Sequence, residues 1–412
     1  MRRFQRLLFK HKVIGIQNFG SPFDQAHEQT EILLEKARNI TFPAKITDQI
    51  VLGFDGYLDN LLSIVRVRHS PSNYEIMEKI AEWAERIAQS AGSSASMERI
   101  VKQISVGGFT CNVGKALSTL CGKARNVHLI GAFGLPTMHQ IFQEQLEEFY
   151  QCTPFSVGNP GYTDAYEFSD GKIMVVSFET INRLDWNQIV VNTGQEFLIE
   201  EFDKSQLWGV GYWSSSPHMS EIFSALQTTI FPSLSHSAHS KYLILDLSDL
   251  RKKPLSQLAE LNSLLPRFEE YVQVVLLLND RELEGLGAAL NGKAEQNPLA
   301  LTRLIQKKLD LSFVISHGPK LATLVSKKIE NLVLNAFTSS PRFTTSAGDH
   351  FTAGVAYALL AKAPIEVISL LGNCVSSFFV RKGASPTAPE LQQFLAHYTK
   401  YLEKDRDIIV GH

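Results

Sequence analysis

Short apolar runs alternate with amphipathic stretches along most of the chain. The apolar runs have the length and content of buried strands, and they cover residues 49–54, 127–130, 242–245, 272–278 and 313–315. Stretches with helical periodicity separate them, for example residues 113–120 and 351–360. Because parallel strands need a crossover between them, this alternation predicts an α/β domain whose mostly parallel sheet is covered by helices on both faces.

Two stretches depart from that alternation. Residues 164–168 and 173–178 flank Ser169-Asp170-Gly171-Lys172, and this pattern predicts a hairpin on an Asp-Gly turn. Such a hairpin fits a small β flap over the carboxyl edge of the sheet, where ligands of α/β proteins bind. Residues 72–90 instead predict a charged amphipathic helix with a capping box at its start.

The first 46 residues are mixed in character and contain one amphipathic stretch, residues 24–38. We therefore expect an N-terminal extension over residues 1–46, followed by one large domain over residues 47–412.

The charge balance narrows the function classes. The chain has 40 Lys and Arg residues against 42 Asp and Glu residues, so it has no surplus of positive charge for a nucleic acid. No apolar run approaches the ~18 residues that span a bilayer, and the four cysteines are scattered without a CxxC pair. We expect a cytoplasmic protein that acts on a small molecule, with no nucleic-acid or membrane partner.

The strongest chemical signal lies in residues 344–354. The small residues Ser346-Ala347-Gly348 run directly into a predicted helix and are followed by Asp349. Small side chains let backbone N–H groups approach a ligand, and a helix N-terminus favours negative charge. A carboxylate beside such an anion site can accept the proton of an attacking hydroxyl, as phosphoryl transfer requires. The alternative for Asp349 is a purely structural place in the first helical turn.

Three further segments carry candidate ligand-binding residues. They are Gly107-Gly108 with Asn112 at a helix entry, Asn279 with Glu282 after the strand at 272–278, and Asp55 with Asp59 after the first strand. Carboxylates and amides at strand ends can organise Mg²⁺ through water or accept hydrogen bonds from a polyhydroxyl substrate. Turns and helix caps are the structural alternatives, and for Asp55 we favour turn chemistry.

The order of these segments resembles that of the ribokinase-like (PfkB) carbohydrate kinases, from about residue 51 to residue 384. The matching motifs are Gly107-Gly108-x3-Asn112 with residues 129–134, Asn279-x-x-Glu282, Ser316-His317-Gly318, Ser346-Ala347-Gly348-Asp349-x-Phe351-x-Ala353-Gly354 and Arg381-Lys382-Gly383-Ala384. The resemblance implies a three-layer α/β/α domain with a small β-stranded lid in residues 57–68 and 160–182. It also implies ATP-dependent transfer of the γ-phosphoryl group to an alcohol group of a sugar or nucleoside.

The resemblance assigns roles residue by residue. Asp349 would be the catalytic base, and the backbone N–H groups of Ala347, Gly348 and Asp349, directly after Ser346, would form the anion site for the γ-phosphate. The substrate would be held by Asp59, Gly107, Gly108 and Asn112. Mg²⁺ would be held, through water, by Asn279 and Glu282, and ATP would lie along Asn279, Glu282, Ser316, Gly318 and Asn373. A monovalent cation is a further candidate ligand, and the protein would be a monomer or a homodimer formed through the lid.

Three departures from the family pattern affect this reading. Ser346 replaces the first glycine of G-A-G-D, and Phe343 stands where the family often has Asp. These two suggest an alternative, a catalytically silent sensor of sugars or nucleotides with the same fold. Phe109 stands where relatives that act on phosphosugars have Lys, which favours an unphosphorylated substrate. A nicotinamide-dependent oxidoreductase is disfavoured because no glycine fingerprint follows an early strand.

Overall fold

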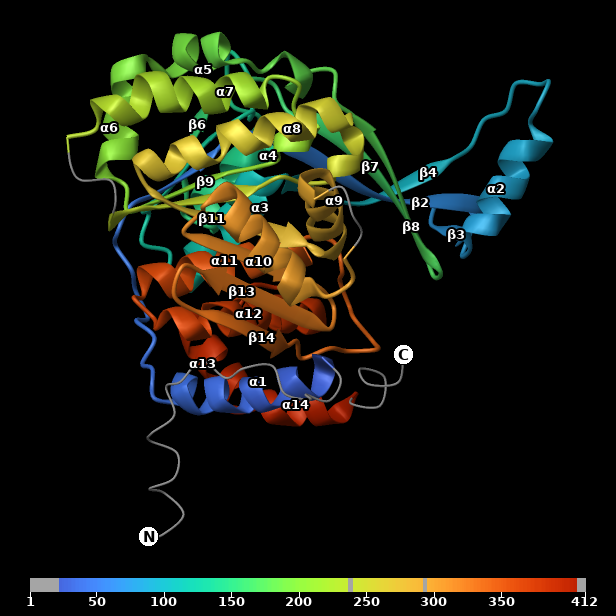
Figure 1. The fold of residues 1–412 in the computed structure, drawn as a ribbon. Coiled ribbons are helices and arrows are strands. Elements are labelled where there is room, and N and C mark those ends of the chain that lie inside the picture. Colours follow the sequence, from blue (N-terminus) through green and yellow to red (C-terminus); the bar gives the residue numbers. More distant parts are fainter. Residues whose placement is uncertain (1–21, 236–239, 292–294, 406–412) are drawn as a thin grey trace.

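The main body is built on one large twisted sheet (Figure 1). The computed structural model describes residues 22–235, 240–291 and 295–405 of the chain. The sheet order is β14-β13-β12-β11-β10-β9-β1-β5-β6. The strands are β1 (Ile50–Gly53), β5 (Val127–Gly131), β6 (Thr153–Ser156), β9 (Leu207–Val210), β10 (Tyr242–Asp246), β11 (Gln273–Asn279), β12 (Phe313–His317), β13 (Leu321–Ser326) and β14 (Glu330–Leu334). The run from β6 to β12 is parallel and β13 and β14 are antiparallel, so the predicted mostly parallel sheet is confirmed.

Helices cover both faces of this sheet and bury two separate cores. Ile50 and Leu52 of β1 belong to one core and Val51 to the other, because successive side chains of a strand point to opposite faces. The first core includes residues of α1 (Pro22–Arg38), α3 (Phe109–Leu120), α11 (Ala347–Leu360), α12 (Ile368–Lys382), α13 (Ala388–Ala396) and α14 (Tyr398–Lys404). The second includes residues of α5 (Trp186–Thr193), α6 (Gln195–Lys204), α7 (Met219–Ala225), α8 (Leu255–Leu264), α9 (Asp280–Asn291) and α10 (Pro298–Leu309). The three-layer α/β/α architecture is confirmed.

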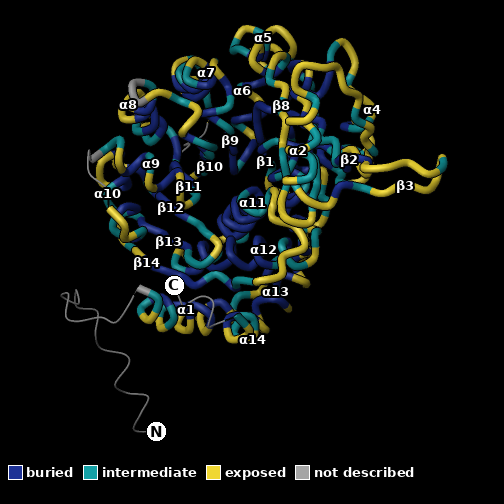
Figure 2. The backbone as a smooth tube through the Cα atoms, turned by 90° about the vertical axis from the view of Figure 1, so that its right-hand side faces the viewer, coloured by how far each residue is buried: buried dark blue, intermediate teal, exposed yellow. Residues whose placement is uncertain are grey.

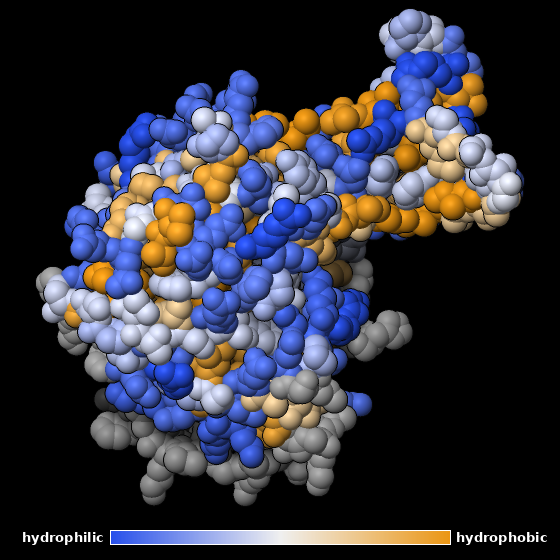
Figure 3. Space-filling view, turned by 90° about the horizontal axis from the view of Figure 1, so that it is seen from above, coloured by the Kyte–Doolittle hydropathy of each residue, from blue (hydrophilic) through white to orange (hydrophobic). Residues whose placement is uncertain are grey.

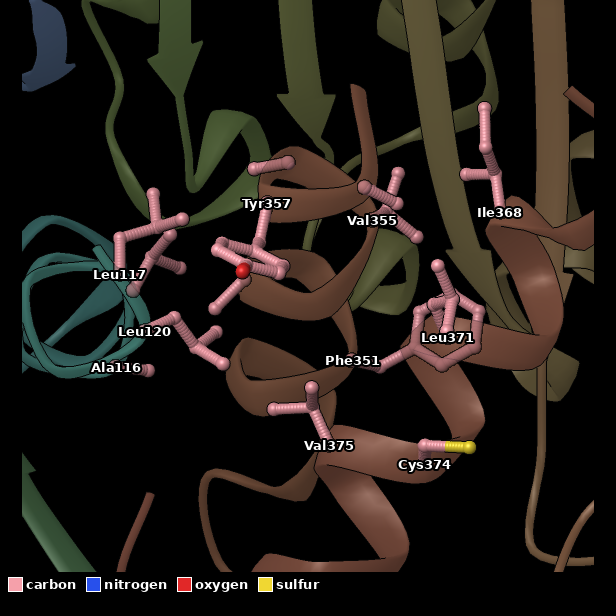
Figure 4. Close-up of a cluster of buried hydrophobic side chains, with 14 of the residues drawn as sticks. Ala116, Leu117, Leu120, Phe351, Val355, Tyr357, Ile368, Leu371, Cys374 and Val375 are labelled. Carbon is pink, nitrogen blue, oxygen red and sulfur yellow. The ribbon is translucent and has the colours of Figure 1, made fainter. Parts of the chain in front are cut away.

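The first core holds the helix that carries Asp349. Figure 4 shows side chains of α3, α11 and α12 gathered together, among them Leu117, Tyr357 and Val375. All three are fully buried. The start of α11 is therefore anchored by tight packing behind it, while its N-terminus reaches the carboxyl edge of the sheet.

A second sheet forms an arm that projects from the body (Figure 1). Its strands are β2 (Tyr57–Ser70), β3 (Asn73–Ile76), β4 (Arg99–Gly107), β7 (Gly161–Phe168) and β8 (Gly171–Ser177). The predicted hairpin is confirmed, with Phe168 opposite Gly171 across the turn. Figure 2 shows that this arm is mostly exposed while the strands of the main sheet are buried. We call this arm the lid.

The prediction of one helix over residues 72–90 is wrong at its start. Residues 73–76 pair with β2 as strand β3, and only α2 (Ile80–Gln89) is helical. Pairing with the long strand β2 outweighs the helical periodicity of this segment, as tertiary context often does. The ring of Trp83 in α2 packs on Tyr166 and Phe168, so one face of the helix is used for packing.

Helix α1 lies along the outer edge of the main sheet, beside β14 (Figure 1). Gln29 and Thr30 accept hydrogen bonds from the backbone N–H groups of Leu332 and Leu334, at 2.8 and 2.9 Å. The described part of the predicted extension thus occupies the position of a neighbouring strand and shields the sheet edge. Its first 21 residues lie outside the described part of the chain. None of the described helices has the length and hydrophobicity needed to cross a membrane.

Candidate active site

Asp349 lies in the first turn of α11, almost fully buried. Its Oδ1 accepts a hydrogen bond from the hydroxyl of Tyr212 at 2.7 Å, and its Oδ2 accepts one from Nδ2 of Asn112 at 3.0 Å. Burial raises the pKa of Asp349 to about 7, although both hydrogen bonds oppose that rise. The carboxyl group is therefore poised to change protonation state near neutral pH, which suits a general base.

Ser346 precedes α11 in a left-handed backbone conformation, with φ 67° and ψ 11°. The first hydrogen bond of the helix runs from the N–H of His350 to the carbonyl of Ser346. The amides of Gly348 and Asp349 precede that bond, so they belong to the first-turn N–H groups that have no partner within a helix. Such groups can receive an anion, and the helix dipole favours negative charge there.

Three cavities meet around this turn. The outer cavity, of about 620 Å³, is lined by Ala347, Gly348 and residues of α9, β12 and α12. The lid cavity, of about 200 Å³, is lined by Asp349, Ser346, Asn112, Gly108 and Asp59 together with the lid. Ala347 and Gly348 thus face one cavity while Asp349 faces the other. The site can place two ligands on opposite sides of the helix start, with their reacting groups meeting at Asp349.

The third cavity, of about 250 Å³, shares Asp59, Asn112 and Ser346 with the lid cavity. We call it the lysine cavity because Lys115 and Lys172 line it. Lys115 donates a hydrogen bond of 2.6 Å to the carbonyl of Val106, and burial lowers the pKa of its ammonium group. Burial raises the pKa of Asp59, while Thr163 and the two lysines oppose that rise.

The glycine pair before α3 lets the lid meet the body closely. A Cβ atom on Gly107 would lie 1.9 Å from Oδ2 of Asp59, and Gly108 has a φ of 91° that favours glycine. Asp55 accepts hydrogen bonds from the N–H groups of Phe109 and Thr110 at 2.9 and 2.8 Å. Asp55 is therefore structural, as expected, but it caps α3 rather than forming a turn.

The position of Phe109 does not support the inference that the substrate is unphosphorylated. Its ring is fully buried and packs against Tyr212, with 5.9 Å between ring centroids. A side chain in the core cannot read whether the substrate carries a phosphate. The positive charges that line the lid and lysine cavities belong to Lys115, Lys172 and Lys252 instead.

Asn279 and Glu282 form a reciprocal capping box at the start of α9. Asn279 donates to both carboxylate oxygens of Glu282, and its own Oδ1 accepts from the N–H of Glu282 at 3.1 Å. The structural alternative for this motif is thus realised, and Asn279 additionally lines the outer cavity. Burial raises the pKa of Glu282 to about 7.

Two acids at this edge of the sheet, Glu282 and Asp246, have the chemistry to hold Mg²⁺. Asp246, at the end of β10, is a half-buried carboxyl group, and its pKa is raised by desolvation and then by the charges of Glu282 and Asp349. A divalent cation would offset this mutual repulsion, and Mg²⁺ commonly uses one or two carboxylates besides water and phosphate. Among the described residues, no group of three or more His, Cys, Asp or Glu forms a ready-made metal cage.

The remaining predicted nucleotide residues lie in different environments. Gly318 lines the outer cavity, where a Cβ atom would lie 2.2 Å from Oδ2 of Asp280. Ser316 is buried and bonds to Thr323 at 2.6 Å, and Asn373 is fully buried within α12. Neither Ser316 nor Asn373 lines the outer cavity, whereas Ser376 and Ser377 of α12 do.

Sequence reasoning missed four residues that line or support the site. They are Tyr212, Asp246, Lys115 and Lys252. Lys252 lines the lid cavity and donates to Ser215 at 3.0 Å. Asp246 ends strand β10, and the rule that polar residues at the ends of parallel strands gather at one edge would have pointed to it. Tyr212 follows β9, a strand that the sequence pattern did not predict. Lys115 lies one helical turn after Asn112, a spacing that places both on one side of α3.

Comparisons with known proteins agree with this geometry. The family model described as prokaryotic ketohexokinase matches residues 26–398. A ketohexokinase of Haloferax volcanii is 32% identical over 357 residues, which is 86% of this chain and 92% of that protein. Among solved structures, ribokinase from Thermotoga maritima has a TM-score of 0.58 at 15% identity and covers 85% of this chain and 99% of its own. Arabidopsis thaliana ribokinase complexed with ribose and ATP gives the same four values.

The solved structures support the fold, while the family model and the haloarchaeal relative support the activity. The catalytically silent alternative finds no support in these relatives. The chain belongs to the prokaryotic ketohexokinase family, and it is an ATP-dependent sugar kinase with a ribokinase-like fold.

Proposed function

We propose that this kinase phosphorylates a hydroxymethyl group of a ketohexose and that Asp349 is its catalytic base. The position of Asp349 carries this proposal, because Asp349 lines the lid cavity while Ala347 and Gly348, directly before it in the helix, line the outer cavity. The ketohexose is inferred from the family and from the relative's name. A six-carbon sugar fits a site in which the lid cavity continues into the lysine cavity.

The residues of the site divide the reaction between them. The sugar hydroxyl loses its proton to Asp349 as its oxygen forms a bond to the γ-phosphorus, and the bond from that phosphorus to the oxygen of ADP breaks. The N–H groups of Gly348 and Asp349, at the helix start beside Ala347, stabilise the charge on the transferred group. Because Tyr212 and Asn112 hold both carboxylate oxygens, Asp349 keeps one orientation throughout.

ATP occupies the outer cavity in this proposal, along Asn279, Gly318, Ala347 and Gly348. Ser316 contributes behind its wall by its hydroxyl contact with Thr323 of β13, and Asn373 lies fully buried in α12. Asp246 and Glu282 would hold Mg²⁺, which neutralises phosphate charge when bound. The monovalent cation stays a prediction, which turnover in potassium against choline buffers would test.

The sugar lies between the lid and the body in this proposal. Asp59 and Asn112 bind its hydroxyls beside Gly107 and Gly108, and Lys115 donates to the end of the sugar remote from Asp349. Closure of the lid over both cavities excludes water, which limits wasteful hydrolysis of ATP.

We also propose a homodimer formed through the lid. Ile104 and Val175 lie on the lid face opposite Asp59, in the row that runs through Asn60 and Asp164. These two, with Val101 and Tyr162, are 40–55% exposed. Figure 3 shows hydrophobic surface along the arm, and large exposed apolar surfaces commonly mark interfaces.

The cytoplasm remains the proposed compartment.

A substrate panel tests the proposal. ADP release would be measured with fructose, tagatose, glucose, ribose and adenosine, and the product of the best substrate identified by ³¹P and ¹³C NMR. We expect the highest kcat/KM with a ketohexose and a phosphate on a hydroxymethyl carbon. A higher kcat/KM with the aldoses or the nucleoside would overturn the substrate assignment while leaving the kinase activity in place.

A further inference from the structure

Ser346 occupies a backbone conformation that a residue with a Cβ atom adopts only at a cost. Its φ of 67° lies in the left-handed region, where glycine is favoured. This residue directly precedes the amides that we place around the transferred phosphoryl group. Any drift of Ser346 out of this conformation would turn those amides away from the outer cavity, so something must hold it.

The side chain of the next helical turn holds Ser346. Nδ1 of His350 lies 2.8 Å from the carbonyl oxygen of Ser346, which also accepts the backbone N–H of His350 at 3.1 Å. Nε2 of His350 lies 2.9 Å from Oγ of Ser385, in the turn after α12. The imidazole ring stacks on Phe379 with 3.6 Å between centroids and an interplanar angle of 15°.

These partners determine the protonation of the ring. A carbonyl oxygen only accepts hydrogen bonds, so Nδ1 carries the proton, and Nε2 accepts from the hydroxyl of Ser385. Burial lowers the pKa of His350 to about 4, so the neutral form with this tautomer is present at neutral pH. The Oγ of Ser346 is held as well, by Nδ2 of Asn112 at 3.0 Å.

We propose that His350, braced by Ser385 and Phe379, is a positioning residue that keeps Ser346 left-handed and thereby aims the first amides of α11. A glycine at this position would adopt the left-handed conformation without strain. Ser346 instead needs the contacts with His350 to hold that conformation. It links α11 to the turn after α12, and through Asn112 it links the anion site to Asp349. The inference rests on the proposed role of the α11 N-terminus as the anion site.

A double-mutant cycle between His350 and Ser346 tests this. His350→Phe keeps an aromatic ring for the stack on Phe379 but removes both ring nitrogens. Ser346→Gly places at position 346 a residue that adopts the left-handed conformation without support from His350. We expect His350→Phe to lower kcat by about 10- to 100-fold, as small misplacements of catalytic groups do, with the KM for the sugar changed less than about two-fold. In the Ser346→Gly background the same change should lower kcat by less than about three-fold, a coupling between contacting residues.

His350→Asn is the conservative variant, since its amide can donate to the carbonyl of Ser346, and it should retain more kcat than His350→Phe. Thermal melting and binding of a non-hydrolysable ATP analogue report on folding, and Ser385→Ala serves as a milder change if His350→Phe does not fold. Equal losses of kcat in both backgrounds, or no advantage of Asn over Phe, would overturn the inference. If His350→Phe keeps full kcat while Asp349→Asn loses it, the inference fails and the proposed base stands; if Asp349→Asn also keeps it, the proposed site fails.

Discussion

The hydroxyl of Tyr212 lies 2.7 Å from Oδ1 of Asp349, and the two residues are 137 positions apart in the chain. This bond stabilises the ionised carboxylate, whose pKa burial has raised to about 7. Only the ionised form can accept a proton, so kcat/KM should rise with pH through about 7. Removing the donor by Tyr212→Phe raises the pKa further, so the rising limb should move to higher pH.

The measurement is kcat/KM for the sugar between pH 5.5 and 9, at constant ionic strength. Tyr271→Phe is the matched control, because Tyr271 packs on Phe231 in the core of the opposite sheet face. If the rising part of the pH profile of kcat/KM does not shift in Tyr212→Phe, the hydrogen bond does not determine the pKa of Asp349.

Lys115 should determine how well the sugar is held rather than how fast it reacts. Its ammonium group lines the lysine cavity beside Asp59, and among the described residues no carboxylate lies within ion-pair distance of it. Lys115→Met keeps the length of the side chain but removes its charge and donors. We expect the KM for the sugar to rise about 10-fold, the effect of losing one charged hydrogen bond, with kcat changed much less.

Steady-state kinetics with the sugar varied at saturating ATP would show this, with Lys45→Met, an exposed lysine outside the cavities, as the control. An unchanged KM would remove Lys115 from the sugar site.

Thr30 should matter for stability and not for turnover. Its buried hydroxyl accepts the N–H of Leu334 and donates to the carbonyl of Ala26. Thr30→Val has nearly the same shape but leaves a buried N–H without a partner, so the free energy of unfolding should fall by about 1–3 kcal/mol. Chemical denaturation measures this change, with Thr30→Ser as the variant that keeps the hydroxyl. If the free energy of unfolding falls as much in Thr30→Ser as in Thr30→Val, the effect comes from lost packing and not from the hydrogen bond.

The lid surface predicts a change of oligomeric state. Val175→Glu places a charge on β8, at the end of the row that begins with Ile104, and replaces one of the exposed apolar side chains of this lid face. Charge within an interface that buries apolar side chains opposes association. Light scattering should give the mass of two chains for the unchanged protein and of one chain for the variant. Arg183→Glu, an exposed change between the lid and α5, is the control. A single-chain mass for the unchanged protein would contradict the dimer.

The sequence pattern predicted the fold well wherever strands are continuous and apolar. Residues 272–278 became β11 within one residue because positions 274–278, which lie between two covered faces, are all apolar. It failed where a segment is short or amphipathic. The four residues of β9 include Gly209, and so gave no strand signal, and residues 73–76 followed a helical period but pair with β2.

The sequence predicted those residues of the candidate site that belong to recognisable motifs. Asp349, Gly108 and Asn112 lie together as their motifs imply. Tyr212 could not be found because it follows the strand that was missed, and its contact with Asp349 exists only after folding. The support of Ser346 by His350 was equally hidden, because it depends on the placement of Ser385 and Phe379 around one ring.

The central claim is that Asp349 removes the proton of the sugar hydroxyl. Asp349→Asn keeps the shape of the side chain and removes its basicity, and general-base catalysis contributes about 10²–10⁴-fold. The decisive measurement is single-turnover transfer of the γ-phosphoryl group to fructose, alongside calorimetric binding of a non-hydrolysable ATP analogue. We predict a rate at least about 10²-fold lower with the affinity for the analogue retained. Transfer at an undiminished rate would contradict the account.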